Sequence, residues 1–461
     1  MTALKRTYTL LIFSLTLIAA NSQLRQPVYN FQKDDTILRK TYYEQALQNK
    51  NSLIGSLGTQ YKKDYQEIYE ARFKIVAELL QGSRSVTDPV AHNYLQSILK
   101  KIVDVNPELK GKEVRLIFSR DWWPNAYSIG EGTLVVNAGL MVYLDNESEL
   151  VFVLCHELAH NYLDHSNKAI KKNVETVNSE EFKNEIKRLS KQQYGAGKQI
   201  DDMIKKFAFG SQQHKRDNEA EADRQAFRFM KNTGYDCGGI KTCLKLLDRI
   251  DDSLFHKPID LEQTFNFSSY PFKKKWVQKE STIFGAMTDD GSPLTQKEKD
   301  SLKTHPDCGI RISLLEDSIQ KVIPGKNFIV NESLFQQLKK DFYIEFTEQQ
   351  FKNNNISRNL YYSLQMLQNN ENFPYAVYAI ARDLNLIYEN QKNHKAGVFT
   401  SKEARGYPTD YNLLLRMLDR LRLEEIAVLN YHFCMQYKAQ MSAYAGFDEE
   451  LNKAIKQKGQ Y

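Results

Sequence analysis

The sequence has few cysteines and no long apolar segment, and both absences limit what the protein can be. Its 461 residues include five cysteines, and no two of them have the Cys-x-x-Cys spacing of zinc fingers or thioredoxin-type redox sites. An oxidising compartment would allow a single bridge between Cys237 and Cys243, and the alternative is that both are small buried thiols. No segment reaches the ~20 apolar residues that a transmembrane helix needs.

The charge of the chain is nearly balanced. Its 63 Lys and Arg against 57 Asp and Glu give a formal net charge of +6. Over a chain of this length the resulting field is weak, whereas nucleic-acid-binding proteins usually concentrate basic charge on one face. We therefore expect no nucleic-acid partner. The hydrophobic fraction of 41% is high enough for a sizeable buried core.

The N-terminus has the pattern of a secretory signal peptide. Two basic residues precede a short apolar run at residues 10–20, and the small residues Ala20 and Ser22 offer a cleavage site before Gln23. The alternatives are an uncleaved membrane anchor and a buried helix. We expect residues 1–22 to be removed and the mature protein to be periplasmic or secreted. It would then have no integral membrane segment and at most a peripheral association with the envelope.

The rest of the chain has mostly helical periodicity, with a small sheet in its first half. Residues 41–105 are expected to be helical, whereas residues 114–118 and 133–136 are rich in strand formers. A long apolar helix is expected at residues 147–165, and a helix rich in alanine and charge at residues 217–231. These patterns predict a mostly helical α+β fold.

Composition also predicts where the domains begin and end. Residues 23–59 form an N-terminal extension, and residues 60–323 form the main domain. Within that domain, residues 252–303 have the composition of an inserted loop or lid. Residues 324–461 form a helical C-terminal region whose helical pairs suggest a tetratricopeptide-like repeat, although no repeat can be aligned.

Residues 153–160, with the sequence VLCHELAH, contain the pattern His-Glu-x-x-His. On a helix, His156 and His160 lie one turn apart on the same face, so both imidazoles can bind one zinc ion. Glu157 lies on the adjacent edge, where it can act as general base toward a water that the ion activates. The alternative is a surface helix with two histidines. The apolar residues 151–154 argue against it, because polar side chains on so buried a helix need partners.

A catalytic zinc site needs a third protein ligand. His165 is disfavoured because, on a continuous helix, it lies about 140° around the axis from His160. The best candidate is Glu219, which shares a helical face with Asp223, so Glu219 can bind zinc while Asp223 accepts the N–H of a ligand histidine. Glu221 points about 200° away from Glu219. The alternative for this segment is a charged, solvent-exposed start of a helix.

Taken in order, these motifs resemble those of peptidase family M48, which includes HtpX and BepA-like proteases. The resemblance covers roughly residues 60–320. It includes Asn125-Ala126, the His-Glu-x-x-His segment, the Glu-x-x-Ala-Asp motif at residues 219–223, and Thr304-His305-Pro306 followed by Arg311. HtpX-type relatives have transmembrane helices, so the soluble exported branch is the closer match. The resemblance implies a gluzincin-like fold with a small sheet over the His-Glu-x-x-His helix.

The resemblance also implies a biological role. It suggests a zinc-dependent endopeptidase, with one zinc ion per chain, that acts in quality control of envelope proteins on unfolded or misassembled protein substrates. The residues themselves name no particular client.

A substrate could add to the sheet as an extra strand. The strand Thr133, Leu134, Val135, Val136 and Asn137 is the expected partner, because main-chain pairing gives affinity with loose sequence preference. The alternative is an interior strand whose two edges are both occupied.

His305 is a further candidate catalytic residue. Pro306 restricts the backbone before it, so His305 is expected to be extended at the end of a loop. It could be a helix-capping or surface residue, a donor to the oxyanion of the reaction, or a latent ligand that occupies the open coordination position. Its place in the family's His-Pro motif favours the latent ligand.

Two other classes of protein compete with an endopeptidase. One is a holdase or assembly factor whose helical C-terminal region binds clients, and the other is a structural zinc protein. Glu157 favours the peptidase, because a structural site needs no general base. A holdase function is also compatible with proteolysis by the same chain.

Overall fold

The computed structural model describes residues 34–190, 216–250, 258–278, 308–404 and 406–461. The described residues fall into two compact units. We call one the sheet unit, with Phe31–Asp251 and Leu302–Tyr343, and the other the helical unit, with Asp252–Ser301 and Ile344–Tyr461. The predicted signal peptide at residues 1–22 lies outside the described residues.

The sheet unit contains a four-stranded sheet with the strand order β1-β2-β4-β3. Its strands are β1 (Ser85–Val86), β2 (Arg115–Ser119), β3 (Ala126–Ser128) and β4 (Thr133–Asn137). β2 and β4 are parallel, and the other two pairs are antiparallel. The two strands predicted from β-forming residues are therefore present as β2 and β4. β1 and β3 are two and three residues long, too short for an alternating pattern to show.

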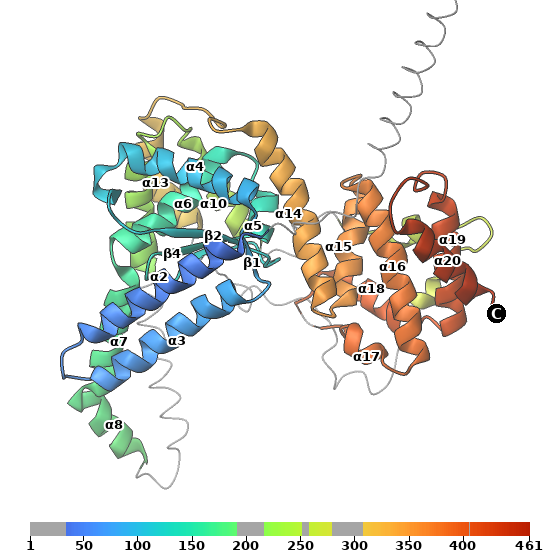
Figure 1. The fold of residues 1–461 in the computed structure, drawn as a ribbon, viewed down its shortest axis with the longest axis horizontal. Coiled ribbons are helices and arrows are strands. Elements are labelled where there is room, and N and C mark those ends of the chain that lie inside the picture. The colour runs from blue at the N-terminus through green and yellow to red at the C-terminus, as the bar shows by residue number, and fades with distance from the viewer. Residues whose placement is uncertain (1–33, 191–215, 251–257, 279–307, 405) are drawn as a thin grey trace, which may run out of the picture. The chain divides into compact units, whose positions relative to one another are not determined.

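Helices cover both faces of this sheet: α2 (Thr36–Gly55) and α3 (Lys62–Gln81) lie on one side, and α4 (Pro89–Val105) and α6 (Glu147–Tyr162) on the other (Figure 1). Ile117 of β2 and Val135 of β4 pack in one apolar cluster with side chains of α2 and α3. Because side chains alternate along a strand, the neighbours of Ile117 and Val135 face the opposite side. The small sheet with helices on both faces confirms the predicted α+β fold.

Six further α-helices lie within the described residues of the sheet unit. They are α5 (Ala138–Tyr143), α7 (His165–Asn178), α8 (Glu180–Ser190), a helix at residues 216–230, α10 (Gly238–Ile250) and α13 (Cys308–Gln320). The boundary between the two units falls inside α14 (Glu332–Lys352), whereas composition placed it at residue 324.

The long helix α6 is buried on all sides. The side chain of Asn146 caps it by accepting the backbone N–H of Glu149, and every residue from 147 to 159 is buried. The prediction extended this helix to His165, but it ends at Tyr162. Asp164 adopts the left-handed conformation (φ 58°), which breaks the helix and lets α7 start in a new direction at His165.

A buried carboxylate fixes the first turn of α6. Glu147 accepts hydrogen bonds from the hydroxyls of Tyr94 and Tyr235, both at 2.9 Å, and from the backbone N–H groups of residues 329–331 at 2.7–2.8 Å. Burial alone would raise the pKa of Glu147, but the backbone N–H groups and Tyr235 outweigh burial and lower it. Glu147 thus joins α6 to three distant segments.

The helical unit confirms the predicted helical C-terminal region. The α-helices that lie wholly within its described residues are α11 (Leu261–Phe265), α15 (Ile356–Gln368), α16 (Phe373–Lys392), α17 (Ala396–Phe399), α18 (Thr409–Arg420), α19 (Leu423–Tyr437) and α20 (Phe447–Lys458). α15 packs on α16, and α19 packs on both α16 and α20. A tetratricopeptide-like repeat stays a prediction.

The described part of the predicted insertion, residues 258–278, belongs to the helical unit. The backbone N–H of Ile259 donates to the carboxylate of Asp410 at 2.9 Å, and Lys273 forms an ion pair with Glu425 at 2.9 Å. The segment therefore packs against C-terminal helices.

All five cysteines are free and buried, so the bridge between Cys237 and Cys243 is not formed. Among the described helices, none is both long enough and apolar enough to cross a bilayer.

The first prediction concerns the carboxylate of Glu147. Glu147→Gln should lower the free energy of unfolding at pH 7 by roughly 2–4 kcal/mol, because an amide cannot accept from all five donors. Glu175→Gln, on an exposed part of α7, is the control and should change it by less than about 0.5 kcal/mol. Urea titration measures both, and a Glu147→Gln protein as stable as wild type would contradict the role assigned to Glu147.

The difference in unfolding free energy between wild type and Glu147→Gln should depend on pH. Because folding lowers the pKa of Glu147, its contribution is fully present above the pKa of the unfolded chain, about 4.3. The contribution is lost as the pH falls through the lower pKa of the folded state. The stability difference between wild type and Glu147→Gln should therefore shrink below about pH 4.

Candidate metal centre

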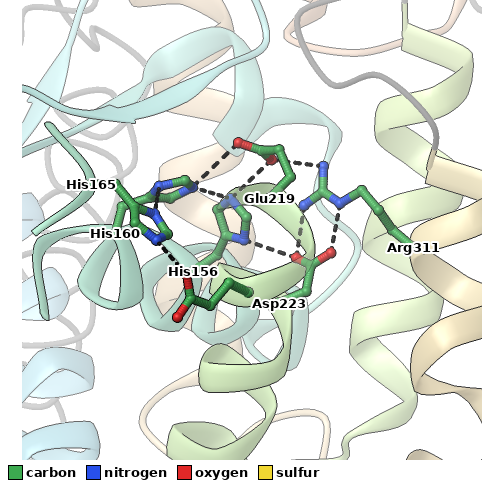
Figure 2. A network of polar contacts seen from close by, with 7 residues as sticks. His156, His160, His165, Glu219, Asp223 and Arg311 are labelled. Atoms are coloured by element: carbon green, nitrogen blue, oxygen red, sulfur yellow. Dashed lines mark hydrogen bonds and ion pairs between the residues drawn. The ribbon is translucent and has the colours of Figure 1, made fainter. Parts of the chain in front are cut away.

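The two histidines of α6 and Glu219 of the helix at residues 216–230 meet at one point (Figure 2). The Nε2 atoms of His156 and His160 are 3.0 Å apart. The Glu219 carboxylate lies 3.4 Å from His156 Nε2 through one oxygen and 3.3 Å from His160 Nε2 through the other. The structure thus brings the three predicted ligands together from two helices about 60 residues apart in sequence.

These distances fit a single metal ion. Four-coordinate ions with bonds of ~2.0–2.1 Å hold their ligand atoms about 3.4 Å apart, close to the separations observed here. Two imidazoles and one carboxylate are also the donor set of catalytic sites that keep a fourth position open for water or substrate. The residues present therefore suit a catalytic rather than a structural metal.

Asp223 holds His156 from the side away from this point. The Nδ1–H of His156 donates to Asp223 at 2.9 Å, which leaves Nε2 free to bind a metal. Burial alone would raise the pKa of Asp223, but hydrogen bonds from Arg311 and His156 outweigh burial and lower it. Asp223 is therefore ionised at neutral pH and lies where its spacing from Glu219 predicted.

Arg311 of α13 was missed as a site residue. Its guanidinium donates twice to Asp223, at 2.6 and 2.8 Å, and lies 3.1 Å from Glu219. It is 4% exposed, so its charge requires buried carboxylate partners. In the sequence, Arg311 stands out only as the arginine that follows the family's Thr-His-Pro motif. A basic residue in an otherwise apolar stretch of a helix was the signal that could have identified it.

Glu157 is buried beside the two histidines, with 6% of its surface exposed. Burial raises the pKa of this carboxyl, and the nearby His156 and His160 counteract the rise only in part. The backbone N–H of Ser128 in β3 also favours the ionised form. A carboxylate whose pKa is raised is suited to accept a proton and give it back.

The position of His165 contradicts the sequence argument that it faces away from the site. His165 would face away only on one continuous helix, whereas the chain turns at Asp164. His165 Nδ1 lies 2.9 Å from His160 Nδ1, on the side of the ring away from the metal ligands. His165 is therefore not among the candidate ligands, but it touches one of them.

The strand predicted to bind substrate is interior. β4 pairs with β2 along one edge and with β3 along the other, and all five of its residues are buried. The prediction that Thr133–Asn137 pairs with a substrate is therefore wrong, because β4 has no free edge. In the described sheet, the edge on this side belongs to β3 (Ala126–Ser128), next to α6. His305, the other predicted catalytic residue, lies outside the described residues.

Comparison with known protein families matches residues 89–319 to the family described as Peptidase family M48. The matched region is half of the 461-residue chain and contains α6, the helix at residues 216–230 and Arg311. None of the curated proteins compared matches the chain. Since the family's model covers both helices that carry the candidate ligands, we conclude that the chain belongs to peptidase family M48, a family of metallopeptidases.

Proposed function

We propose that the chain is a zinc endopeptidase in which His156, His160 and Glu219 bind the ion and Glu157 is the general base. The observation that carries the proposal is the meeting of three side chains beside a buried carboxyl. The two imidazole Nε2 atoms are 3.0 Å apart, and each of them lies 3.3–3.4 Å from one of the two carboxylate oxygens of Glu219. A zinc ion held there would polarise the scissile carbonyl and lower the pKa of a water to about 7.

The roles of the side chains follow from their positions. Glu157 would take the proton of the attacking water and pass it to the leaving amine, which a base with a raised pKa can do in both directions. Asp223 keeps the Nδ1 proton on His156, and Arg311 keeps Asp223 in place. A structural zinc protein needs no general base, so the presence of Glu157 favours catalysis over that alternative.

The substrate would be an extended polypeptide added to the edge of β3. A small apolar pocket lies beside His156 and is lined by Ala126 of β3 and by Leu140, Phe152, Val153 and Leu247, with Arg311 at its margin. The pocket has room for about one water molecule, which is too little for a substrate side chain. Recognition would therefore rest on main-chain pairing, which favours unfolded proteins as substrates because their main-chain groups are free to pair.

Client binding by the helical unit is a second candidate function. A groove between α16 and α20 is lined by charged side chains of both signs, among them Arg382, Lys453, Lys456, Glu389 and Glu450. A groove of this kind supports a holdase or assembly role beside proteolysis. Export and a role in envelope quality control are proposed on the N-terminal pattern and the family resemblance.

The second prediction separates binding of the ion from catalysis. Glu157→Gln should retain about one zinc per chain but lose casein cleavage by roughly 10²–10⁴-fold, because only the base is removed. Glu175→Gln changes an exposed carboxylate of α7 that pairs with Lys171, and it should leave both unchanged. Metal analysis measures the zinc content, and a casein cleavage assay on the same preparations measures the activity. Near-normal cleavage by Glu157→Gln would contradict the peptidase proposal.

The third prediction concerns the third ligand. Glu219→Ala should weaken zinc binding by more than about 100-fold, beyond what the loss of an outer partner causes. Glu221→Ala, two residues along the same helix, should weaken it by about 10-fold or less, because Glu221 contacts His165 and not the ion's position. Competition with a chromophoric chelator measures both affinities. Equal losses in the two variants would remove Glu219 from the ligand set.

A further inference from the structure

His165, which none of the proposed steps uses, lies against the metal ligand His160. The two rings are 4.9 Å apart between centroids and inclined by 74° (Figure 2). The left-handed turn at Asp164 creates this contact, and the turn is itself fixed. The side chain of Asp164 accepts from Asn167 at 2.7 Å, and its backbone carbonyl accepts from Lys168 at 3.0 Å.

With His165 neutral, the hydrogen bonds allow one arrangement of protons. Glu221 lies 3.2 Å from His165 Nε2, and an ionised carboxylate can only accept, so His165 carries its proton on Nε2. The Nδ1 of a neutral His165 is then an acceptor. It faces His160 Nδ1 at 2.9 Å, so His160 must donate its Nδ1–H. The Nε2 of His160 is left with a lone pair, and that nitrogen is the one that faces Glu219.

His156 is oriented in the same way by Asp223, and both supporting carboxylates come from the helix that carries Glu219. On a helix, Glu219 and Glu221 point about 200° apart, so the second carboxylate cannot bind the same ion. It reaches the site only through His165. Each candidate ligand histidine therefore has its own carboxylate, directly for His156 and through a second imidazole for His160.

We propose that His165 and Glu221 are positioning residues for the metal ligand His160. The proposal rests on the proposed zinc site, and neither residue touches the ion or the substrate. His165 fixes the ring and the proton of His160, and Glu221 fixes the proton of His165. His165 is 6% exposed, whereas the side chain of Glu221 is 51% exposed, so the larger effect should come from His165.

A purely structural role would make His165 a space-filling residue at the start of α7. Two substitutions of His165 distinguish a space-filling role from a positioning role, because each role predicts that a different one of them is tolerated better. His165→Phe keeps the ring but removes both nitrogens, whereas His165→Asn is smaller but keeps an acceptor where Nδ1 stood. A space-filling role predicts that Phe is tolerated better than Asn. A positioning role predicts that Asn is tolerated better than Phe.

The experiment measures zinc affinity of the full chain by competition with a chromophoric chelator, and the absorption spectrum of the Co²⁺-loaded protein. We expect His165→Phe to weaken zinc binding about 10–100-fold and to alter the Co²⁺ spectrum, and His165→Asn to recover most of both. His92→Phe, which changes a half-buried histidine of α4, is the matched control and should match wild type. His165→Phe within twofold of wild type, or Asn weaker than Phe, would overturn the proposal.

Two further measurements distinguish a failure of the positioning role from a failure of the proposed zinc site. Wild-type protein that binds no zinc, or Glu219→Ala that binds as wild type does, would overturn the zinc site itself and the positioning role with it. Wild-type binding with loss in Glu219→Ala, but none in His165→Phe, would overturn the positioning role alone. Glu221→Ala changes a half-exposed residue, so it provides a folded variant if His165→Phe does not fold. Unchanged zinc affinity in Glu221→Ala would remove Glu221 from the proposal.

Discussion

The site depends on the neutralisation of two carboxylates, the buried Asp223 and the partly buried Glu219. Charges taken out of water are costly unless opposite charge and hydrogen bonds accompany them. Arg311 supplies one positive charge and contacts both carboxylates. Burial alone would lower the pKa of His156, but hydrogen bonds to these carboxylates raise it to about 10. This rise shows how strongly the position favours positive charge, and a divalent cation would satisfy the same demand.

The same requirement explains how the elements around the site are held. α6, the helix at residues 216–230 and α13 each contribute one part of the charged cluster, so none can move without exposing an unpaired buried charge. Both ends of α6 are also fixed. Glu147 joins its first turn to distant segments, and the left-handed turn at Asp164 ends it. The ligand histidines are therefore carried by a helix with little freedom to shift, as a preorganised site requires.

Much of the site could be predicted because its residues are local in sequence. His156, Glu157 and His160 lie within one helical turn and a half, and Glu219 and Asp223 share a face of one helix, so helical periodicity alone relates them. The fold class followed from the same periodicity. These relations depend only on the helix being regular, which both segments are at the residues concerned.

The sequence-based predictions failed where the position of a residue depends on the backbone conformation of one residue or on a long-range contact. A single left-handed residue, Asp164, turns His165 toward His160, and helical geometry cannot anticipate it. The interior position of β4 depends on β3, which is too short to have a sequence signature. Arg311 is 88 residues from Asp223, and only the tertiary structure shows that their charges meet.

The most direct test of the account is the position of zinc in a crystal of the zinc-loaded protein, located by anomalous diffraction at the zinc absorption edge. One peak per chain is expected, about 2.0–2.1 Å from the Nε2 atoms of His156 and His160 and from a carboxylate oxygen of Glu219. His165 and Glu221 should lie outside bonding distance of the peak. A peak bound by other residues, or no peak at these three side chains, would contradict it.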